Sequence, residues 1–252
     1  HDNNIQFILA LGYNSYFDGV KDEHDARFKE TFEWTYTAPS LNIPWYLIAG
    51  NHDWNGNVSA QVAYSKLSKR WMFPDLYYGL KFGIPGSSST VEILMLDTVQ
   101  LCGNSDHDFL GKQPKGPEDA ALADAQWKWL ESRLQASTAD YLIVAGHYPV
   151  ISIAEHGPTQ QLVETLRPML HKYRATAYFS GHDHNLQHLQ YTLSNLTIDY
   201  FVSGAANFID PSLKHQGSVE PGVSKFHWAN IFSLGGFAYV HATPDNMTFQ
   251  FI

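Results

Sequence analysis

The run Tyr141-Leu142-Ile143-Val144-Ala145-Gly146-His147 joins β-prone apolar residues directly to a glycine and a histidine. Similar runs that lead into a glycine occupy residues 7–14, 45–52, 177–182 and 200–204. Their hydrophobicity is continuous rather than alternating, which predicts strands that are buried on both faces. A glycine directly after a strand predicts a sharp turn. These runs therefore predict a sheet whose two faces are covered by helices or by another sheet.

Helical periodicity fills the segments between these strands. The predicted helices cover residues 25–36, 58–71, 120–136 and 162–173. Strand and helix alternate through most of the chain, which predicts the α/β fold class. A polar stretch rich in glycine and proline predicts an exposed loop over residues 102–118, and residues 235–252 predict a final hairpin. No repeat and no long linker divides the chain, so we expect a single domain over residues 1–252.

The composition excludes two classes of partner. The chain has 252 residues, and 25 acidic against 16 basic side chains give a net charge of −9. Because acidic side chains outnumber basic ones, the chain has no broad basic surface to bind a phosphate backbone, and we expect no nucleic-acid partner. No apolar run reaches the ~20 residues that span a bilayer, so we expect no membrane partner either. Protonation of all 13 histidines would make the net charge positive, which favours a protein that works in an acidic compartment.

Histidines and an asparagine follow the predicted strand ends. Asn51 and His52 follow one strand, His147 the next, and His182 and His184 a third. Because the carboxyl ends of strands in α/β folds meet at one edge of the sheet, we expect these side chains to converge. Imidazole and amide donors without a thiolate suit zinc, iron or manganese. A single histidine would be interpreted as a hydrogen-bonded turn residue, but four at matching strand ends indicate a shared site.

Three motifs resemble those of the metallophosphoesterases in order and spacing: Gly50-Asn51-His52-Asp53, Gly146-His147-Tyr148-Pro149 and Gly181-His182-Asp183-His184. Flanking sequence at residues 56–61, 101–106 and 152–159 is similar to the tartrate-resistant purple acid phosphatases. The resemblance covers nearly the whole chain. It implies a metallophosphoesterase sandwich of two mixed β-sheets flanked by helices. It also implies an acid phosphatase, that is, a phosphoric monoester hydrolase.

The resemblance further implies a binuclear metal site that holds Fe(III) beside a divalent iron, zinc or manganese ion. By position in the motifs, Asn51, His147 and His182 would bind the divalent ion. Tyr16 and His184 would bind the ferric ion, and the Tyr16 phenolate would give the purple colour. Two cations can neutralise phosphoryl oxygens and acidify a bound water, which agrees with hydrolysis in acid.

Two histidines are implied to act on the phosphate without binding metal. His52 and His156 would stabilise its oxygens or protonate the leaving alcohol. The implied substrates are small phosphomonoesters or phosphoproteins. Glycosylation sequons begin at Asn57, Asn195 and Asn246, which favours a secreted or lysosomal glycoprotein.

The sequence departs from the family pattern in the segment expected to bridge the two metal ions. The family pattern is Gly-Asp-x-x-Tyr, and here it reads Gly12-Tyr13-Asn14-Ser15-Tyr16. Tyr13 thus stands at the position of the bridging aspartate, and a neutral phenol with a pKa of about 10 is a poor bridge. The family's opening Asp-x-Gly strand has no counterpart before Ile5, so we expect a chain incomplete at its N-terminus and an open sheet edge beside residues 5–11.

These departures predict impaired turnover and leave two alternatives open. One is a catalytically inactive purple acid phosphatase-like protein that serves as a binding or scaffold protein. The other is a metal-dependent phosphodiesterase or nucleotidase with the same framework of motifs. In addition, Gln160 and Gln161 follow Thr159 where the family has the cysteine that pairs with the counterpart of Cys102. We therefore expect Cys102 to be a free thiol.

Overall fold

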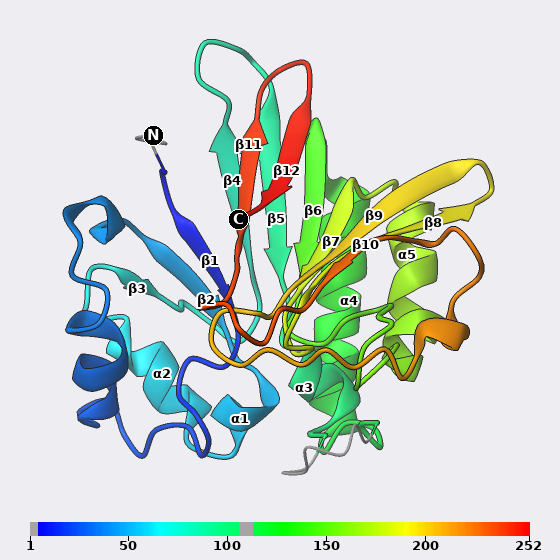
Figure 1. Cartoon of the computed structure of the whole chain (residues 1–252). Coiled ribbons are helices and arrows are strands. Elements are labelled where there is room, and N and C mark those ends of the chain that lie inside the picture. Colours follow the sequence, from blue (N-terminus) through cyan, green and yellow to red (C-terminus); the bar gives the residue numbers. More distant parts are fainter. Residues whose placement is uncertain (1–4, 106–112) are drawn as a thin grey trace.

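The computed structural model describes residues 5–105 and 113–252, and within these ranges it contains a seven-stranded sheet, a three-stranded sheet and a two-stranded hairpin (Figure 1). The strands are β1 (Ile8–Leu11), β2 (Trp45–Ile48), β3 (Trp71–Met72), β4 (Tyr78–Gly83), β5 (Thr90–Met95), β6 (Tyr141–Ala145), β7 (Ala177–Ser180), β8 (Leu186–Leu193), β9 (Leu196–Ser203), β10 (Ser224–Trp228), β11 (Ala238–Ala242) and β12 (Met247–Phe251). The α-helices are α1 (Asn51–Trp54), α2 (Val58–Tyr64), α3 (Thr98–Cys102), α4 (Ala120–Ala136) and α5 (Arg167–Lys172). Shorter turns are the π-helical η1 (Phe28–Glu33) and η3 (Leu162–Leu166) and the 3-10 helical η2 (Pro39–Leu41) and η4 (Gln216–Ser218). The predicted α/β class is confirmed.

The seven-stranded sheet has the order β10-β8-β9-β7-β6-β5-β4. Its central strands β5, β6, β7 and β9 are parallel, whereas β4, β8 and β10 pair antiparallel with their neighbours, so the sheet is mixed. In the smaller sheet β1, β2 and β3 are parallel. Within the described residues β1 pairs with β2 alone, which leaves its other edge without a strand, as expected.

Both faces of the central strands are buried, which confirms the prediction from their continuous hydrophobicity. Val144 of β6 packs with Leu130 of α4 and Leu170 of α5 on one face of the sheet. Its neighbour Ile143 packs on the other face with Leu47 of β2. Because successive strand residues point to opposite faces, one strand contributes to both cores. Each such side chain contributes about 1.5–3 kcal/mol by leaving water.

Two of the predicted helices differ from the structure. The helix predicted over residues 58–71 ends at Tyr64, and Trp71 belongs to β3. Ser65 follows the helix, and its hydroxyl donates to the Phe73 carbonyl and accepts the Phe73 N–H, which joins the end of α2 to the residue after β3. The segment predicted as a helix over residues 25–36 is helical only between Phe28 and Glu33.

Other segments agree with the predictions. Helix α4 spans the predicted residues 120–136. The helix predicted over residues 162–173 is divided where Pro168, which has no backbone N–H to donate, stands in the first turn of α5. Part of the loop predicted at residues 102–118 lies outside the described residues, and Cys102 is a buried free thiol.

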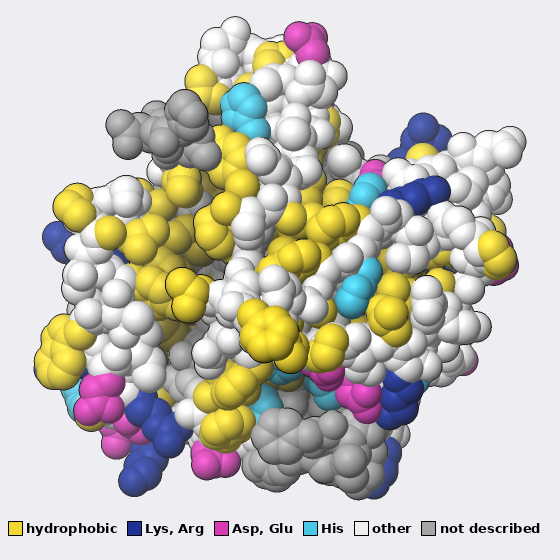
Figure 2. Space-filling view, in the orientation of Figure 1, with side chains coloured by type: hydrophobic (Ala, Val, Ile, Leu, Met, Phe, Trp, Pro, Cys, Tyr) yellow, Lys and Arg dark blue, Asp and Glu magenta, His cyan; other side chains and the backbone are white. Residues whose placement is uncertain are grey.

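The C-terminal segment forms the predicted hairpin of β11 and β12. Phe249 of β12 stacks on Phe201 of β9 with ring centroids 3.6 Å apart, which fastens the hairpin to the larger sheet. Figure 2 shows hydrophobic side chains gathered between this hairpin and the sheet that contains β1. Over residues 5–105 and 113–252, none of the helices combines the length and apolarity that crossing a bilayer requires.

Candidate active site

The side chains that were predicted to converge do meet where the two sheets face each other. His147 follows β6, and His182 follows the parallel neighbour β7, so their rings lie at the same sheet edge with centroids 5.0 Å apart. Asn51 begins α1 directly after β2, and its Oδ1 lies 3.1 Å from His147 Nε2. The topology of parallel strands thus brings together residues that are more than 90 positions apart.

His147 presents an unprotonated nitrogen to Asn51. Its Nδ1–H donates to the Leu11 carbonyl at 2.7 Å, and burial lowers the pKa of His147 to about 3. The ring is therefore neutral above that pH, and the lone pair of Nε2 faces Asn51 Oδ1. Two lone pairs at this distance repel unless the amide turns to donate its N–H or a cation binds both. This pair is arranged as two ligands of one metal ion would be.

Tyr13 lies among these donors, because its hydroxyl is 2.8 Å from Nδ1 of His182. Burial raises the pKa of Tyr13 well above its ordinary value, and burial lowers the pKa of His182 well below its own. The proton therefore stays on the phenol, and the Tyr13 O–H donates to His182 Nδ1. Above the lowered pKa of His182, the ring is neutral and its nitrogen lone pair is engaged by Tyr13.

Tyr16 and His184 lie together on the other side of Tyr13. The Tyr16 hydroxyl is 3.4 Å from His184 Nε2. Burial raises the pKa of Tyr16 and lowers the pKa of His184 to about 4, so the phenol is the donor. The two sequence motifs that supply these residues therefore meet in space, as the resemblance implied.

His52 and His156 border the same group. The His52 Nδ1–H donates to the Phe17 carbonyl at 3.0 Å, which fixes the tautomer of the ring. The His156 ring packs on His182 with centroids 4.0 Å apart. Among the described residues the buried Nδ1 of His156 has no hydrogen-bond partner, so it can form a hydrogen bond with a ligand, as the donor when it carries the proton.

Asp53 and Asp183 fix the loops that carry the site. Asp53 accepts the backbone N–H groups of Gly50, Asn14 and Ser15, which joins the turn after β1 to the turn after β2. Asp183 accepts the backbone N–H of His156 and the Ser152 hydroxyl. Both carboxylates orient backbone amides, and the imidazole of His147 is oriented instead by a backbone carbonyl.

Sequence reasoning missed two contributors. The Leu11 carbonyl orients His147, and no sequence signal could indicate it because every residue carries a carbonyl. Phe208, from the loop after β9, places its ring 5.8 Å from that of His184 and 5.5 Å from that of Tyr16. It lies in no motif, so only the fold reveals it.

The donors that are present fit one part of the implied metal pair better than the other. Asn51, His147 and His182 offer an oxygen and two nitrogens, which suit a divalent ion. Tyr13 occupies the position of the bridge, where its ring adds bulk and no carboxylate. Among the described residues no three His, Cys, Asp or Glu side chains form a preformed metal cluster.

Comparison with known proteins identifies the family. Residues 2–186 match the calcineurin-like phosphoesterase family model. Tartrate-resistant acid phosphatase type 5 of Mus musculus is 55% identical over 98% of this chain and 74% of that protein. This chain belongs to the purple acid phosphatases of the calcineurin-like phosphoesterase superfamily. A plant member, purple acid phosphatase 7 of Arabidopsis thaliana, is 32% identical over 97% of this chain and 71% of that protein.

Membership of the purple acid phosphatases confirms the predicted enzyme class, because these relatives are named acid phosphatases. The fold is shared more widely. The structure of GAP50, the anchor in the inner membrane complex of Plasmodium, superposes with a TM-score of 0.79 at 21% identity. The match covers 98% of this chain and 74% of that one, and at this identity it shows the fold alone.

Proposed function

We propose that this purple acid phosphatase hydrolyses phosphomonoesters in the pocket that corresponds to the binuclear metal site of its family and that Tyr13 reduces its turnover. The observation that carries the proposal is the convergence of Asn51, His147 and His182 at the ends of three different strands and turns. Because these residues are far apart in sequence, packing alone gives no reason for three nitrogen and oxygen donors to face one another.

The proposed ligands of the divalent ion, an iron, zinc or manganese, are Asn51, His147 and His182. The lone pair that His147 directs at Asn51 supports this choice. Tyr16 and His184 are the proposed ligands of Fe(III), supported by the approach of the phenol to the imidazole. Bound metal ions would supply Lewis-acid stabilisation of the phosphoryl charge.

His52 and His156 are the proposed groups that act on the ester. His156 Nδ1 is buried without a partner among the described residues, so a phosphate or leaving-group oxygen would satisfy it. His52 is held by the Phe17 carbonyl beside Tyr13 and Tyr16, at the border of the same pocket. A positioned imidazole that delivers a proton to a leaving alkoxide contributes about 10²–10⁴ in rate.

Small phosphomonoesters or phosphoproteins are the proposed substrates, and a secreted or lysosomal glycoprotein is the proposed form. Support for glycosylation comes from Asn57, Asn195 and Asn246, all three of which are exposed. Asn57 caps α2 through its Oδ1, so a glycan on Nδ2 would leave the capping acceptor in place.

The test compares hydrolysis of a nitrophenyl phosphate monoester with that of its diester at pH 5 after the protein is loaded with iron and zinc. We expect the monoester to react at least tenfold faster. His52→Asn should lower monoester turnover by about 10²-fold. The matched control is His188→Asn, because His188 pairs with Asp199 outside the pocket. Faster diester turnover, or equal rates in the two variants, would contradict the proposal.

A second candidate, a catalytically inactive binding or scaffold protein, is favoured by the position of Tyr13 inside the pocket. GAP50 is described as an anchor, which shows that a protein of this fold can serve as one. The same assay separates the two candidates. Under the scaffold hypothesis, the unmodified chain hydrolyses the monoester no faster than the His52→Asn variant.

A further inference from the structure

The Tyr13 ring lies in the middle of the pocket. Its centroid is 4.3 Å from that of His147 and 4.9 Å from that of His52. It stacks on His184 at 5.5 Å with an angle of 15° between the ring planes, and Tyr16 lies 4.7 Å away. One side chain therefore contacts residues from both proposed metal-binding sets and separates them.

The Tyr13 hydroxyl also engages a donor atom directly. It donates to Nδ1 of His182 at 2.8 Å, so a metal ion can bind that nitrogen only after the phenol has moved. The proposed ligands of the second ion, Tyr16 and His184, both lie against the Tyr13 ring. A carboxylate at residue 13 would offer two oxygens in place of this ring, whereas the phenol fills the space with carbon.

The backbone holds Tyr13 in this place from both sides. Gly12 has φ +99° and Tyr13 has φ +59°, a left-handed turn directly after β1. A Cβ at Gly12 would lie 2.3 Å from Nδ1 of His147, so the turn is pressed against that ring. On the other side, the N–H groups of Asn14 and Ser15 donate to the buried Asp53 carboxylate. The position of Tyr13 is thus built into the turn.

We propose that Tyr13 is a fixed plug of the metal pocket that limits this chain to at most one divalent ion and keeps the second ion out. The inference rests on the proposed phosphatase pocket, but it concerns metal occupancy and requires no turnover. The ring and the hydroxyl of Tyr13 have different roles in this proposal. The ring excludes the second ion, and the hydroxyl competes with the first ion for His182.

The experiment is equilibrium dialysis of the purified chain against Zn(II), followed by metal counting by mass spectrometry. We expect no more than one zinc per unmodified chain and about two per Tyr13→Asp chain. Tyr13→Phe keeps the ring and removes the hydroxyl, so it should still bind one zinc, about fivefold more tightly, which is the gain from releasing one hydrogen bond. The matched control is Tyr141→Phe, which removes a hydroxyl that donates to the Thr243 carbonyl away from the pocket.

A second readout reports on Tyr16 alone. After loading with Fe(III), Tyr13→Asp should gain a visible phenolate-to-iron band that is absent from the unmodified chain and from Tyr13→Asp/Tyr16→Phe. Thermal melts show whether each variant is folded. Two zinc ions in the unmodified chain, or a folded Tyr13→Asp that still binds one or none, would overturn the plug. Two ions in Tyr13→Asp without ester hydrolysis would overturn the proposed phosphatase instead and leave the plug standing.

Discussion

Gly50 determines where the His147 ring can lie. A Cβ at residue 50 would stand 2.8 Å from both Cε1 and Nε2 of that ring. The φ of −101° suits alanine, so the effect of a substitution here is steric. We expect Gly50→Ala to lower the free energy of unfolding by about 1–3 kcal/mol, because the fully buried imidazole must shift. Urea unfolding measures the loss, and the zinc count should fall as Nε2 moves away from Asn51.

The control for this prediction is Gly83→Ala at the end of β4. A Cβ there would meet nothing within 4 Å. We expect its free energy of unfolding to change by less than about 0.5 kcal/mol. If both alanine variants lose the same amount of stability, the contact between residue 50 and His147 does not matter.

At the residue scale, the sequence indicated which side chains converge but not what lies between them. Asn51, His147 and His182 each follow a recognisable strand and glycine, so their meeting could be predicted. The Tyr13 hydroxyl bond to His182 depends on a turn with positive φ whose direction no local pattern reveals. The bond between His147 and the Leu11 carbonyl is equally invisible in sequence.

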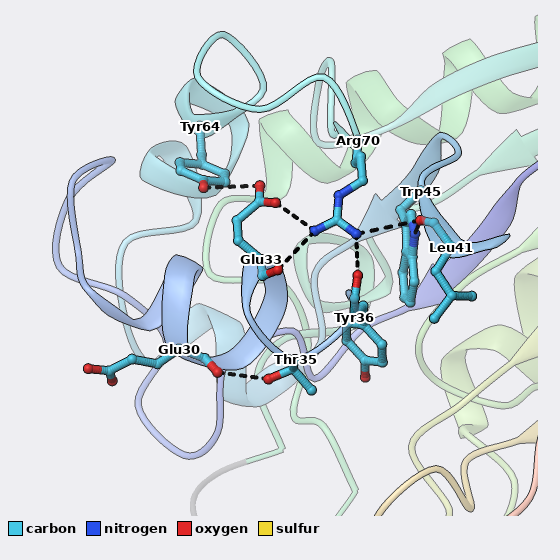
Figure 3. A network of polar contacts seen from close by, with 8 residues as sticks. All are labelled: Glu30, Glu33, Thr35, Tyr36, Leu41, Trp45, Tyr64 and Arg70. Atoms are coloured by element: carbon cyan, nitrogen blue, oxygen red, sulfur yellow. Dashed lines mark hydrogen bonds and ion pairs between the residues drawn. The ribbon is translucent and has the colours of Figure 1, made fainter. Parts of the chain in front are cut away.

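At the scale of elements, Arg70 ties the segment that contains η1 and η2 to the strand β3 (Figure 3). One nitrogen of its guanidinium donates to the Tyr36 carbonyl at 2.6 Å, and the other pairs with Glu33 Oε2 at 2.6 Å. The guanidinium also lies over the Phe32 ring, 4.7 Å from its centroid. A planar fork of donors can serve these partners at once, whereas an ammonium cannot.

Replacing Arg70 with lysine keeps the charge but should weaken the attachment of the segment that contains η1 and η2. We expect Arg70→Lys to lower the free energy of unfolding by about 1–3 kcal/mol, since two or more hydrogen bonds are lost. Hydrogen exchange should rise over residues 28–41. The exposed side chain of Arg174 makes no hydrogen bond or ion pair among the described residues, so Arg174→Lys is the control. Unchanged exchange over residues 28–41 in Arg70→Lys would argue against the tie.

Element prediction succeeded for helix α4 and missed several strands, among them the internal strands β5 and β8 and the edge strands β4 and β10. Helix α4 was predicted in full because its periodic residues follow Asp119, whose side chain caps the helix. The edge strands β4 and β10 gave no clear signal. In β4 buried and exposed residues alternate over a short span, and β10 is largely polar or half-exposed. Such strands depend on their neighbours in the sheet rather than on their own sequence.

At the scale of the whole molecule, buried titratable groups oppose one another as pH falls. Burial raises the pKa of Asp97 to about 7, so its contribution to stability is complete below about pH 4 and is lost as pH rises through about 7. Burial lowers the pKa of His147 to about 3 and of His184 to about 4. These histidines contribute stability that is present above about pH 6.5 and is lost as pH falls toward 4. The two trends partly cancel, so we expect the stability of the fold to change less between neutral and acidic pH than either group alone would require.

Removing the titration of Asp97 should reveal the loss of stability that protonation of the histidines causes. Asp97→Asn keeps a good N-cap for α3 but cannot take up a proton, so the stabilisation on acidification disappears. Between pH 7.5 and pH 5, the free energy of unfolding of the metal-free variant should fall by about 2 kcal/mol more than that of the unmodified chain. Urea unfolding at the two pH values measures this difference, and Asp124→Asn on the exposed face of α4 is the control. If Asp97→Asn shows the same pH difference as the unmodified chain, Asp97 is already ionised at pH 5 and does not stabilise the fold on acidification.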